Sequence, residues 1–187
     1  MTIGQELGKG TVCFERLFME TYDYPKAEEV NQLLFDLIQK SDKRNIQPEV
    51  IKAKMTSDLG QVKEVKDIID WTSDIIHNDF LGYLKTSKKN VYCSDVWGNF
   101  YTYRDCAEPH HHAPAAYSWV YFVHSPNGSS PLIFLTNGVQ VDPKPGRMVI
   151  FESRINHTVP PNNCHGRCIL SGNFIHYHNN TTSTYYS

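Results

Sequence analysis

The chain of 187 residues has the length of one domain, and its charges nearly balance, with 18 basic and 20 acidic residues. A net charge of −2 gives none of the basic surface by which nucleic-acid-binding proteins approach phosphates. No apolar run approaches the ~18 residues that a membrane span needs, and no secretion leader is recognisable. We therefore expect a cytoplasmic globular protein whose five cysteines are reduced.

The first half of the chain is predicted to be mainly helical. A short strand within residues 11–22 precedes a helix over 27–40, and a second helix is expected over 62–84. In both helices, apolar side chains recur three and four residues apart, so each helix has one face to bury. The intervening residues 41–61 are polar and are broken by proline and glycine.

From residue 91 onward, short runs rich in β-branched and aromatic residues alternate with turns of Pro, Gly and Asn. The expected strands are 91–96, 99–103, 118–124, 131–135, 147–151 and 167–176. Helices followed by short strands indicate an α+β fold, which we expect to be a double-stranded β-helix, or jelly roll, with the N-terminal helices packed outside. One domain would fill residues 1–187, with a mainly helical support region over 1–90, a jelly-roll core over 91–178 and a polar tail over 179–187.

Three consecutive histidines stand before one of these strands. Because residues two apart on a strand share a face, His110 and His112 can reach one metal ion while His111 points away. His157 comes just after the strand over 147–151, at the rim of a sheet, where sites are commonly built. We predict that His110, His112 and His157 hold one ion. Three such ligands leave positions open for a bidentate cosubstrate and dioxygen, as in non-haem Fe(II) oxygenases.

Two other interpretations of these histidines stay open. A carboxylate, Asp105 or Glu108, could replace one imidazole, since two histidines and one carboxylate are the commoner ligand set for iron. Alternatively, the run from His110 to His112 is a solvated turn, and the jelly roll is a binding or structural module without a metal.

Arg167 begins the last predicted strand, ten residues after His157. Ile169, Ser171 and Asn173 share its strand face, so the strand can form a pocket floor that contains one buried cation. A buried cation requires an anion, and the planar guanidinium suits a carboxylate. We predict that Arg167 binds a carboxylate of the cosubstrate, with Ser171 and Asn173 beside it.

These blocks resemble the phage and bacterial 2-oxoglutarate/Fe(II) oxygenases that are similar to prolyl hydroxylases. The resemblance rests on Trp97–Tyr101, Pro109–His112, Tyr117–Val123, Pro143–Phe151, Glu152–His157 and Arg167–Asn173. It covers residues 91–176, and the spacing of ten residues between the last histidine and the arginine is a fairly specific feature.

The resemblance implies a double-stranded β-helix, Fe(II), and 2-oxoglutarate as cosubstrate with O₂. It also implies that Tyr103 or Tyr101, on the strand before the histidines, bonds the far carboxylate of 2-oxoglutarate. The implied activity is hydroxylation with release of succinate and CO₂, on peptidyl-proline if the substrate is also shared. A phage-encoded protein of this kind would act in the cytoplasm of the host.

The chain departs from the family pattern at four positions. Trp119, Phe122, Ala113 and Ile169 stand where the pattern has Gly, Tyr, Pro and Ser. The changes at Phe122 and Ile169 remove two hydroxyls that could bind the cosubstrate, and the common His-x-Asp pair is missing. The competing function is therefore a cupin-like jelly-roll protein that binds a metal but does not use 2-oxoglutarate.

Overall fold

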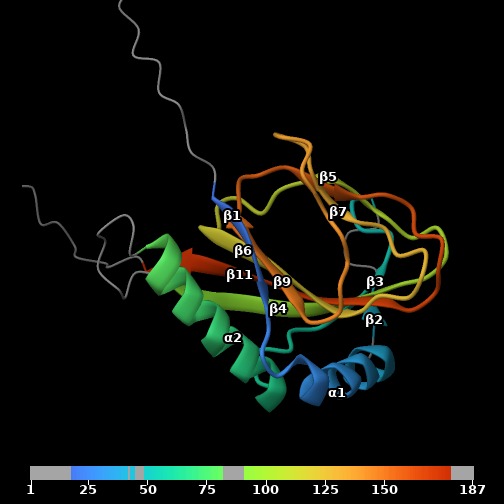
Figure 1. Ribbon diagram of the computed structural model, residues 1–187, viewed down its shortest axis with the longest axis horizontal. Coiled ribbons are helices and arrows are strands. Elements are labelled where there is room, and N and C mark those ends of the chain that lie inside the picture. The colour runs from blue at the N-terminus through green and yellow to red at the C-terminus, as the bar shows by residue number, and fades with distance from the viewer. Residues whose placement is uncertain (1–17, 42, 45–48, 82–90, 178–187) are drawn as a thin grey trace, which may run out of the picture.

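The computed structural model describes residues 18–41, 43–44, 49–81 and 91–177 as a mainly β structure with two α-helices (Figure 1). In chain order its elements are β1 (Met19–Asp23), α1 (Ala27–Lys40), β2 (Lys43–Arg44), β3 (Lys54–Thr56), α2 (Lys63–Ile75), the π-helical turn η1 (Ile76–Phe80), β4 (Val91–Tyr101), β5 (Ala107–His110), β6 (Tyr117–His124), β7 (Leu132–Phe134), β8 (Gln140–Val141), β9 (Arg147–Glu152), β10 (His157–Val159) and β11 (Arg167–His176). The beginning of the expected first strand, the last residues of the expected second helix and the polar tail lie outside the described residues.

Two antiparallel sheets lie face to face. The larger has the strand order β1-β9-β6-β11-β4-β3-β2, and the smaller has the order β5-β10-β7-β8. Apolar side chains from both sheets, among them Phe122, Phe134 and Phe151, form one core between them. This arrangement confirms the α+β class and the double-stranded β-helix predicted from the sequence.

Helices α1 and α2 cover the outer face of the larger sheet (Figure 1). The buried residues of α1 are Val30, Leu34 and Ile38, whose spacing of four places them on one side of the helix. Gly98 in β4 allows α1 to approach closely, since a Cβ at that position would lie 2.6 Å from Cγ1 of Ile38. The helix therefore lies directly against the backbone of the sheet.

The larger sheet is buried on both faces. In β6, Trp119, Tyr121 and Val123 pack toward the helices, whereas Val120 and Phe122 pack toward the smaller sheet. Both sets of side chains avoid water, which explains why residues 119–123 of this strand are all aliphatic or aromatic instead of alternating with polar residues.

A β-bulge at Ser94 determines which side chains of β4 face the space between the sheets. Asn173 of β11 pairs with Asp95, but the next residue, Phe174, pairs with Cys93, so Ser94 has no partner. The extra residue reverses the alternation along the strand. As a result, Cys93 packs toward the helices, while Asp95 faces the space between the two sheets.

Short strands account for most differences from the expected elements. Strands β2, β3, β5, β8 and β10 are two to four residues long, too short for an alternating pattern to show in the sequence. The two strands expected over 91–96 and 99–103 form the single strand β4. The N-terminal half also adds β1, β2 and β3 to the larger sheet.

We propose that these elements form one domain, because helices and strands share one core. None of the helices in the described residues is long and apolar enough to cross a bilayer.

Candidate metal centre

A cavity of about 420 Å³ lies between the two sheets, within the usual size range of ligand sites. Alternate residues of two paired strands form its floor: Asp95, Trp97, Asn99 and Tyr101 of β4, and Arg167, Ile169, Ser171 and Asn173 of β11. Tyr101 pairs in register with Arg167 at one end, and Asp95 pairs with Asn173 at the other. The cavity therefore has a cationic end and an anionic end.

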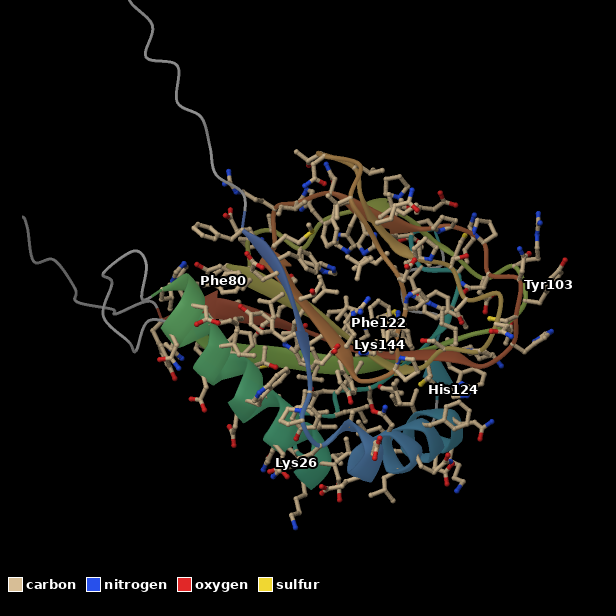
Figure 2. All side chains as sticks on the ribbon, in the orientation of Figure 1. Lys26, Phe80, Tyr103, Phe122, His124 and Lys144 are labelled. Atoms are coloured by element: carbon tan, nitrogen blue, oxygen red, sulfur yellow. The ribbon has the colours of Figure 1, made fainter. Side chains whose placement is uncertain are left out.

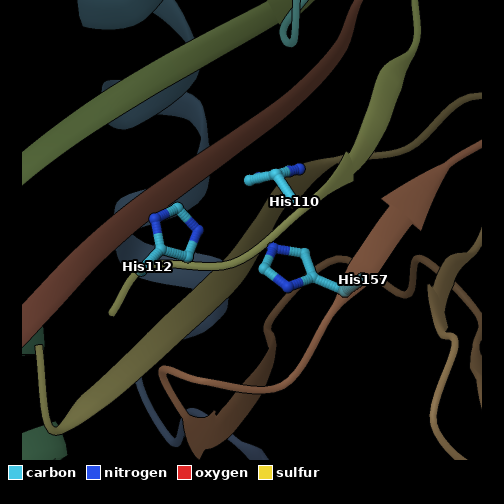
Figure 3. Close-up of side chains that lie close together, drawn as sticks. All are labelled: His110, His112 and His157. Carbon is cyan, nitrogen blue, oxygen red and sulfur yellow. The ribbon is translucent and has the colours of Figure 1, made fainter. Parts of the chain in front are cut away.

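Three histidine side chains converge on this cavity (Figure 3). His110 ends β5 and pairs in register with His157, the first residue of β10. His112 lies two residues further along, where its backbone N–H donates to the carbonyl oxygen of Ser153 at 2.7 Å. One ligand nitrogen from each ring lies within 4.8 Å of the other two. The structure thus brings together the three histidines that were predicted to share an ion.

Backbone carbonyls set the hydrogen positions on two of these rings. Nδ1 of His110 lies 2.7 Å from the carbonyl oxygen of Glu108, and Nδ1 of His157 lies 3.0 Å from that of Ile155. A carbonyl oxygen can only accept, so each Nδ1 carries the hydrogen and each Nε2 keeps its lone pair. This is the tautomer by which an imidazole binds a metal through Nε2.

Burial keeps the three imidazoles neutral. It lowers the pKa of His157 to about 3 and the pKa of His112 to about 4, and it also lowers the pKa of His110. The neighbouring imidazoles act in the same direction, because a second positive charge close by is unfavourable. Neutral imidazole is the form that binds metal, so the cluster needs to release no protons on binding at neutral pH.

In the part of the chain that the structure describes, no carboxylate joins the histidines. Asp105 instead closes a turn, where its Oδ2 accepts the N–H of Thr102 at 2.7 Å and the hydroxyl of Thr102 at 2.9 Å. Glu108 pairs with Lys52 at 2.7 Å on the surface. His111 is exposed, as predicted. The geometry therefore favours an imidazole as the third donor over either carboxylate.

Arg167 lines the same cavity and is fully buried. Its guanidinium carbon lies 4.5 Å from the ring centre of Tyr101 and 5.7 Å from that of Phe122. Within the described residues, none of its three side-chain nitrogens has a hydrogen-bond partner. Burial lowers the pKa of Arg167, and Tyr101 beside it opposes that shift. A buried guanidinium without a carboxylate partner is suited to binding an anion.

Tyr103 does not line the cavity, which corrects one of the sequence-based predictions. Its side chain is 55% exposed and projects from the periphery, whereas Phe122 lies in the interior (Figure 2). The reason is that β4 ends at Tyr101, and the turn closed by Asp105 directs the following residues outward. Tyr101, the alternative, is only 1% exposed and lies against Arg167.

Ser171 and Asn173 both line the cavity but differ in their neighbours. Ser171 lies on the floor between the two ends. Asn173 lies at the end away from Arg167, where its Oδ1 accepts the hydroxyl of Ser118 at 2.8 Å and its Nδ2 donates to Oδ2 of Asp95 at 2.9 Å. Asn173 is therefore placed to orient Asp95, not to bind an anion beside Arg167 as the sequence suggested.

On the cavity floor, the sequence did not reveal Asp95, Trp97 and Asn99 of β4 as site residues. Trp97 lies close to the histidines, with its ring 5.9 Å from that of His112 between centres. Asn99 is buried, and its Oδ1 has no hydrogen-bond partner among the described residues. The sequence feature that could have identified them is their spacing of two residues, which continues to Tyr101 and places all four side chains on one face of the strand. It was missed because the strand was expected to break near Trp97.

No protein-family profile and no curated protein sequence matches the chain. Solved structures do match. A viral collagen prolyl hydroxylase from Paramecium bursaria Chlorella virus-1, solved as a 2-oxoglutarate complex, has a TM-score of 0.67 at 14% identity over 83% of this chain and 94% of that one. A Pseudomonas putida prolyl-4-hydroxylase has a TM-score of 0.67 at 17% identity over 85% and 92%. A Burkholderia pseudomallei oxidoreductase of the 2OG-Fe(II) oxygenase family has a TM-score of 0.60 at 12% identity over 84% of each chain. The chain therefore has the double-stranded β-helix fold of these prolyl hydroxylases and 2-oxoglutarate/Fe(II) oxygenases.

Proposed function

We propose that the protein is a non-haem oxygenase that uses Fe(II), 2-oxoglutarate and O₂ to hydroxylate a C–H bond of its substrate. The reaction converts substrate, 2-oxoglutarate and O₂ into hydroxylated substrate, succinate and CO₂. One observation carries the proposal: a single cavity holds three neutral histidines and a fully buried arginine without a partner among the described residues. The structural likeness to a prolyl hydroxylase solved with 2-oxoglutarate and to an oxidoreductase of the 2OG-Fe(II) oxygenase family supports it.

The histidines suit Fe(II) by their chemistry. His110 and His157 would each offer Nε2, whose lone pair is left free by the carbonyl bound at Nδ1, and His112 would be the third donor. Bound iron supplies the oxygen chemistry, and three protein donors leave coordination positions for a cosubstrate and O₂.

Arg167 suits a carboxylate of 2-oxoglutarate. Its nitrogens would donate charge-assisted hydrogen bonds, which are strengthened by the low polarity of a fully buried position. Tyr101 covers one face of the guanidinium and would hold it in place, and the hydroxyl of Ser171 is on the same floor. Because this end of the cavity is buried, it would also keep water from the bound carboxylate.

A cupin-like metal protein that does not use 2-oxoglutarate is the second candidate. The observation in its favour is the donor set, which consists of three imidazoles without the carboxylate that is commoner at oxygenase iron. This alternative leaves the buried Arg167 without a role, and we therefore rank it second.

The substrate is a separate question. The neighbours named as prolyl hydroxylases make peptidyl-proline the first substrate to test.

The test is an anaerobic titration of metal-free protein with Fe(II) and then with 2-oxoglutarate, followed in the visible spectrum. We expect a weak metal-to-ligand charge-transfer band that requires both additions. Stoichiometric metal binding without such a band would favour the cupin-like alternative, and failure of the wild-type protein to bind metal would contradict the site itself.

Two histidine variants assign the site. His157→Ala should lose both the metal and the band, because one of three donors is gone. His111→Ala is the matched control, since His111 is exposed and adjacent to the cluster, and it should keep both.

A further inference from the structure

The two charged ends of the cavity are too far apart for one small cosubstrate. Arg167 and Asn173 lie six residues apart on β11, so their backbones are separated by roughly 20 Å at about 3.3 Å per residue. Asp95 pairs in register with Asn173, so its carboxylate lies at the end away from Arg167. On the proposed function, 2-oxoglutarate is a five-carbon dianion, which cannot span this length and would be repelled by Asp95. The anionic end is therefore left for the other substrate.

Asp95 is held in position without being neutralised. Its carboxylate accepts a hydrogen bond from Nδ2 of Asn173 at 2.9 Å and another from the hydroxyl of Ser94. Among the described residues, no lysine or arginine forms an ion pair with it. The bulge at Ser94 turns Asp95 toward the cavity, as bulges beside sites commonly do.

A polar network connects Asp95 to the segment that carries His112. Asn173 bridges Asp95 and Ser118, and the hydroxyl of Ser118 lies 2.7 Å from that of Ser153. The carbonyl of Ser153 accepts the backbone N–H of His112. A chain of hydrogen bonds through Asn173, Ser118 and Ser153 thus links Asp95 to the segment that carries His112.

Trp97 is the next residue along this face of β4. It is partly exposed, lines the cavity, and lies beside His112 with 5.9 Å between ring centres. An indole face and a carboxylate together favour an organic cation, the first through the ring quadrupole and the second through charge-assisted hydrogen bonds.

We propose that Asp95 and Trp97 form the subsite for the primary substrate, and that this substrate carries an ammonium or guanidinium group near the C–H bond that is hydroxylated. Asn173 is a positioning residue, which orients the Asp95 carboxylate. This inference rests on the proposed function for the hydroxylation, but the binding of the cation does not depend on iron.

The test compares two probes that differ only in the cation, Nα-acetyl-L-lysine amide and Nα-acetyl-L-norleucine amide. Binding to full-length metal-free protein is followed by the indole N–H resonance of Trp97, which is assigned with the Trp97→Phe variant. We expect the lysine probe to shift this resonance and to bind about tenfold more tightly than the norleucine probe, as one charge-assisted contact allows. Equal binding of the two probes, or tighter binding of Nα-acetyl-L-prolinamide, would overturn the proposal.

Three variants assign the preference to the carboxylate. Asp95→Asn should abolish the discrimination between the probes, whereas Asp95→Glu should retain part of it. Asp74→Asn, on the exposed face of α2, is the matched control and should retain all of it. The resonance of the buried Trp119 reports whether each variant is folded. Discrimination that survives in folded Asp95→Asn would overturn the proposal.

The outcome is separable from that of the proposed function. If the charge-transfer band forms but the probes bind equally, the oxygenase assignment stands and the cationic substrate is wrong. If the lysine probe binds selectively and the band never forms, the subsite stands and the oxygenase assignment is wrong.

Discussion

Arg167 illustrates how one residue can oppose stability while serving binding. A fully buried guanidinium loses its hydration, and in the described part of the metal-free protein no hydrogen bond replaces it. Losing water without gaining a partner is unfavourable. An anion in the cavity would offset this cost through charge-assisted hydrogen bonds, so its binding should raise the stability of the protein.

Arg167→Leu should therefore leave the Tm of the metal-free protein unchanged or raise it. The same change should weaken the binding of 2-oxoglutarate by roughly 2–5 kcal/mol, the usual effect of removing one partner from a buried charge pair. Scanning calorimetry of the metal-free protein measures the first effect, and calorimetry of the metal-loaded protein with and without 2-oxoglutarate measures the second.

The matched control is Arg147→Leu, because Arg147 pairs with Asp23 at the surface and lies outside the cavity. It should keep the increase in Tm that 2-oxoglutarate causes in the wild-type protein. A large loss of stability in metal-free Arg167→Leu would show that the arginine has a structural partner instead.

The lowered pKa values of His112 and His157 lead us to predict that acid destabilises the metal-free protein. Both titrate near the ordinary value of 6.5 in the unfolded chain, but at about 4 and about 3 in the folded protein. Between these values the unfolded state binds more protons, so the stability present above pH 6.5 is lost as the pH falls through this window. Each histidine contributes at most about 1.4 kcal/mol per pH unit.

Thermal unfolding between pH 6.5 and pH 4 measures this dependence. His157→Asn removes one titrating group and should flatten the profile, whereas His111→Ala should reproduce the wild-type slope. Parallel profiles for wild type and His157→Asn would mean that carboxylates, not the buried histidines, cause the acid sensitivity.

At the level of elements, the contact between α1 and β4 depends on the missing side chain of Gly98. In Gly98→Ala the new Cβ would lie 2.6 Å from Cγ1 and 2.8 Å from Cδ1 of Ile38, so the helix or its side chain must move. Overpacking of this kind costs about 1–3 kcal/mol. Urea unfolding should show that loss.

Shortening the side chain of Ile38 tests whether its contact with the new Cβ causes the loss of stability. Ile38→Ala leaves a cavity and is destabilising by itself, at about 2–5 kcal/mol. The double variant Gly98→Ala/Ile38→Ala should be no less stable than Ile38→Ala alone, because the clash is gone. Gly60→Ala, whose new Cβ would lie no closer than 3.3 Å to its nearest neighbour, Oδ1 of Asp58, is the control and should have a smaller effect.

Strand β4 also shows where prediction from the sequence ends. Its period of two was visible in the residue types, but the bulge at Ser94 and the end of the strand at Tyr101 depend on pairing with β11 and on the turn closed by Asp105. A shift of one residue in the position of the bulge moves the side chains beyond it to the other face of the sheet. The sequence therefore leaves the choice between Tyr103 and Tyr101 open and does not reveal the orientation of Asp95.

For the whole molecule, long and strongly patterned segments were the predictable part. The helix expected over 27–40 and the strand expected over 167–176 match α1 and β11, and the jelly roll follows from many short strands after the helices. Strands of two to four residues were not predictable, because their existence depends on partners distant in the chain. His110 and His112 could be paired from the sequence because their spacing of two is a local property, and His157 because it follows a long apolar strand. The orientation of Asp95 depends on a bulge and is not a local property.

The burial of Arg167 has a consequence for the sequence of events in turnover. On the proposed function, the dicarboxylate should bind at Arg167, which is fully buried, before the primary substrate binds beside Trp97, which is partly exposed. Steady-state kinetics should then show compulsory order, in which a dead-end analogue of the primary substrate inhibits uncompetitively against 2-oxoglutarate. Noncompetitive inhibition would indicate that the two molecules bind independently and in either order.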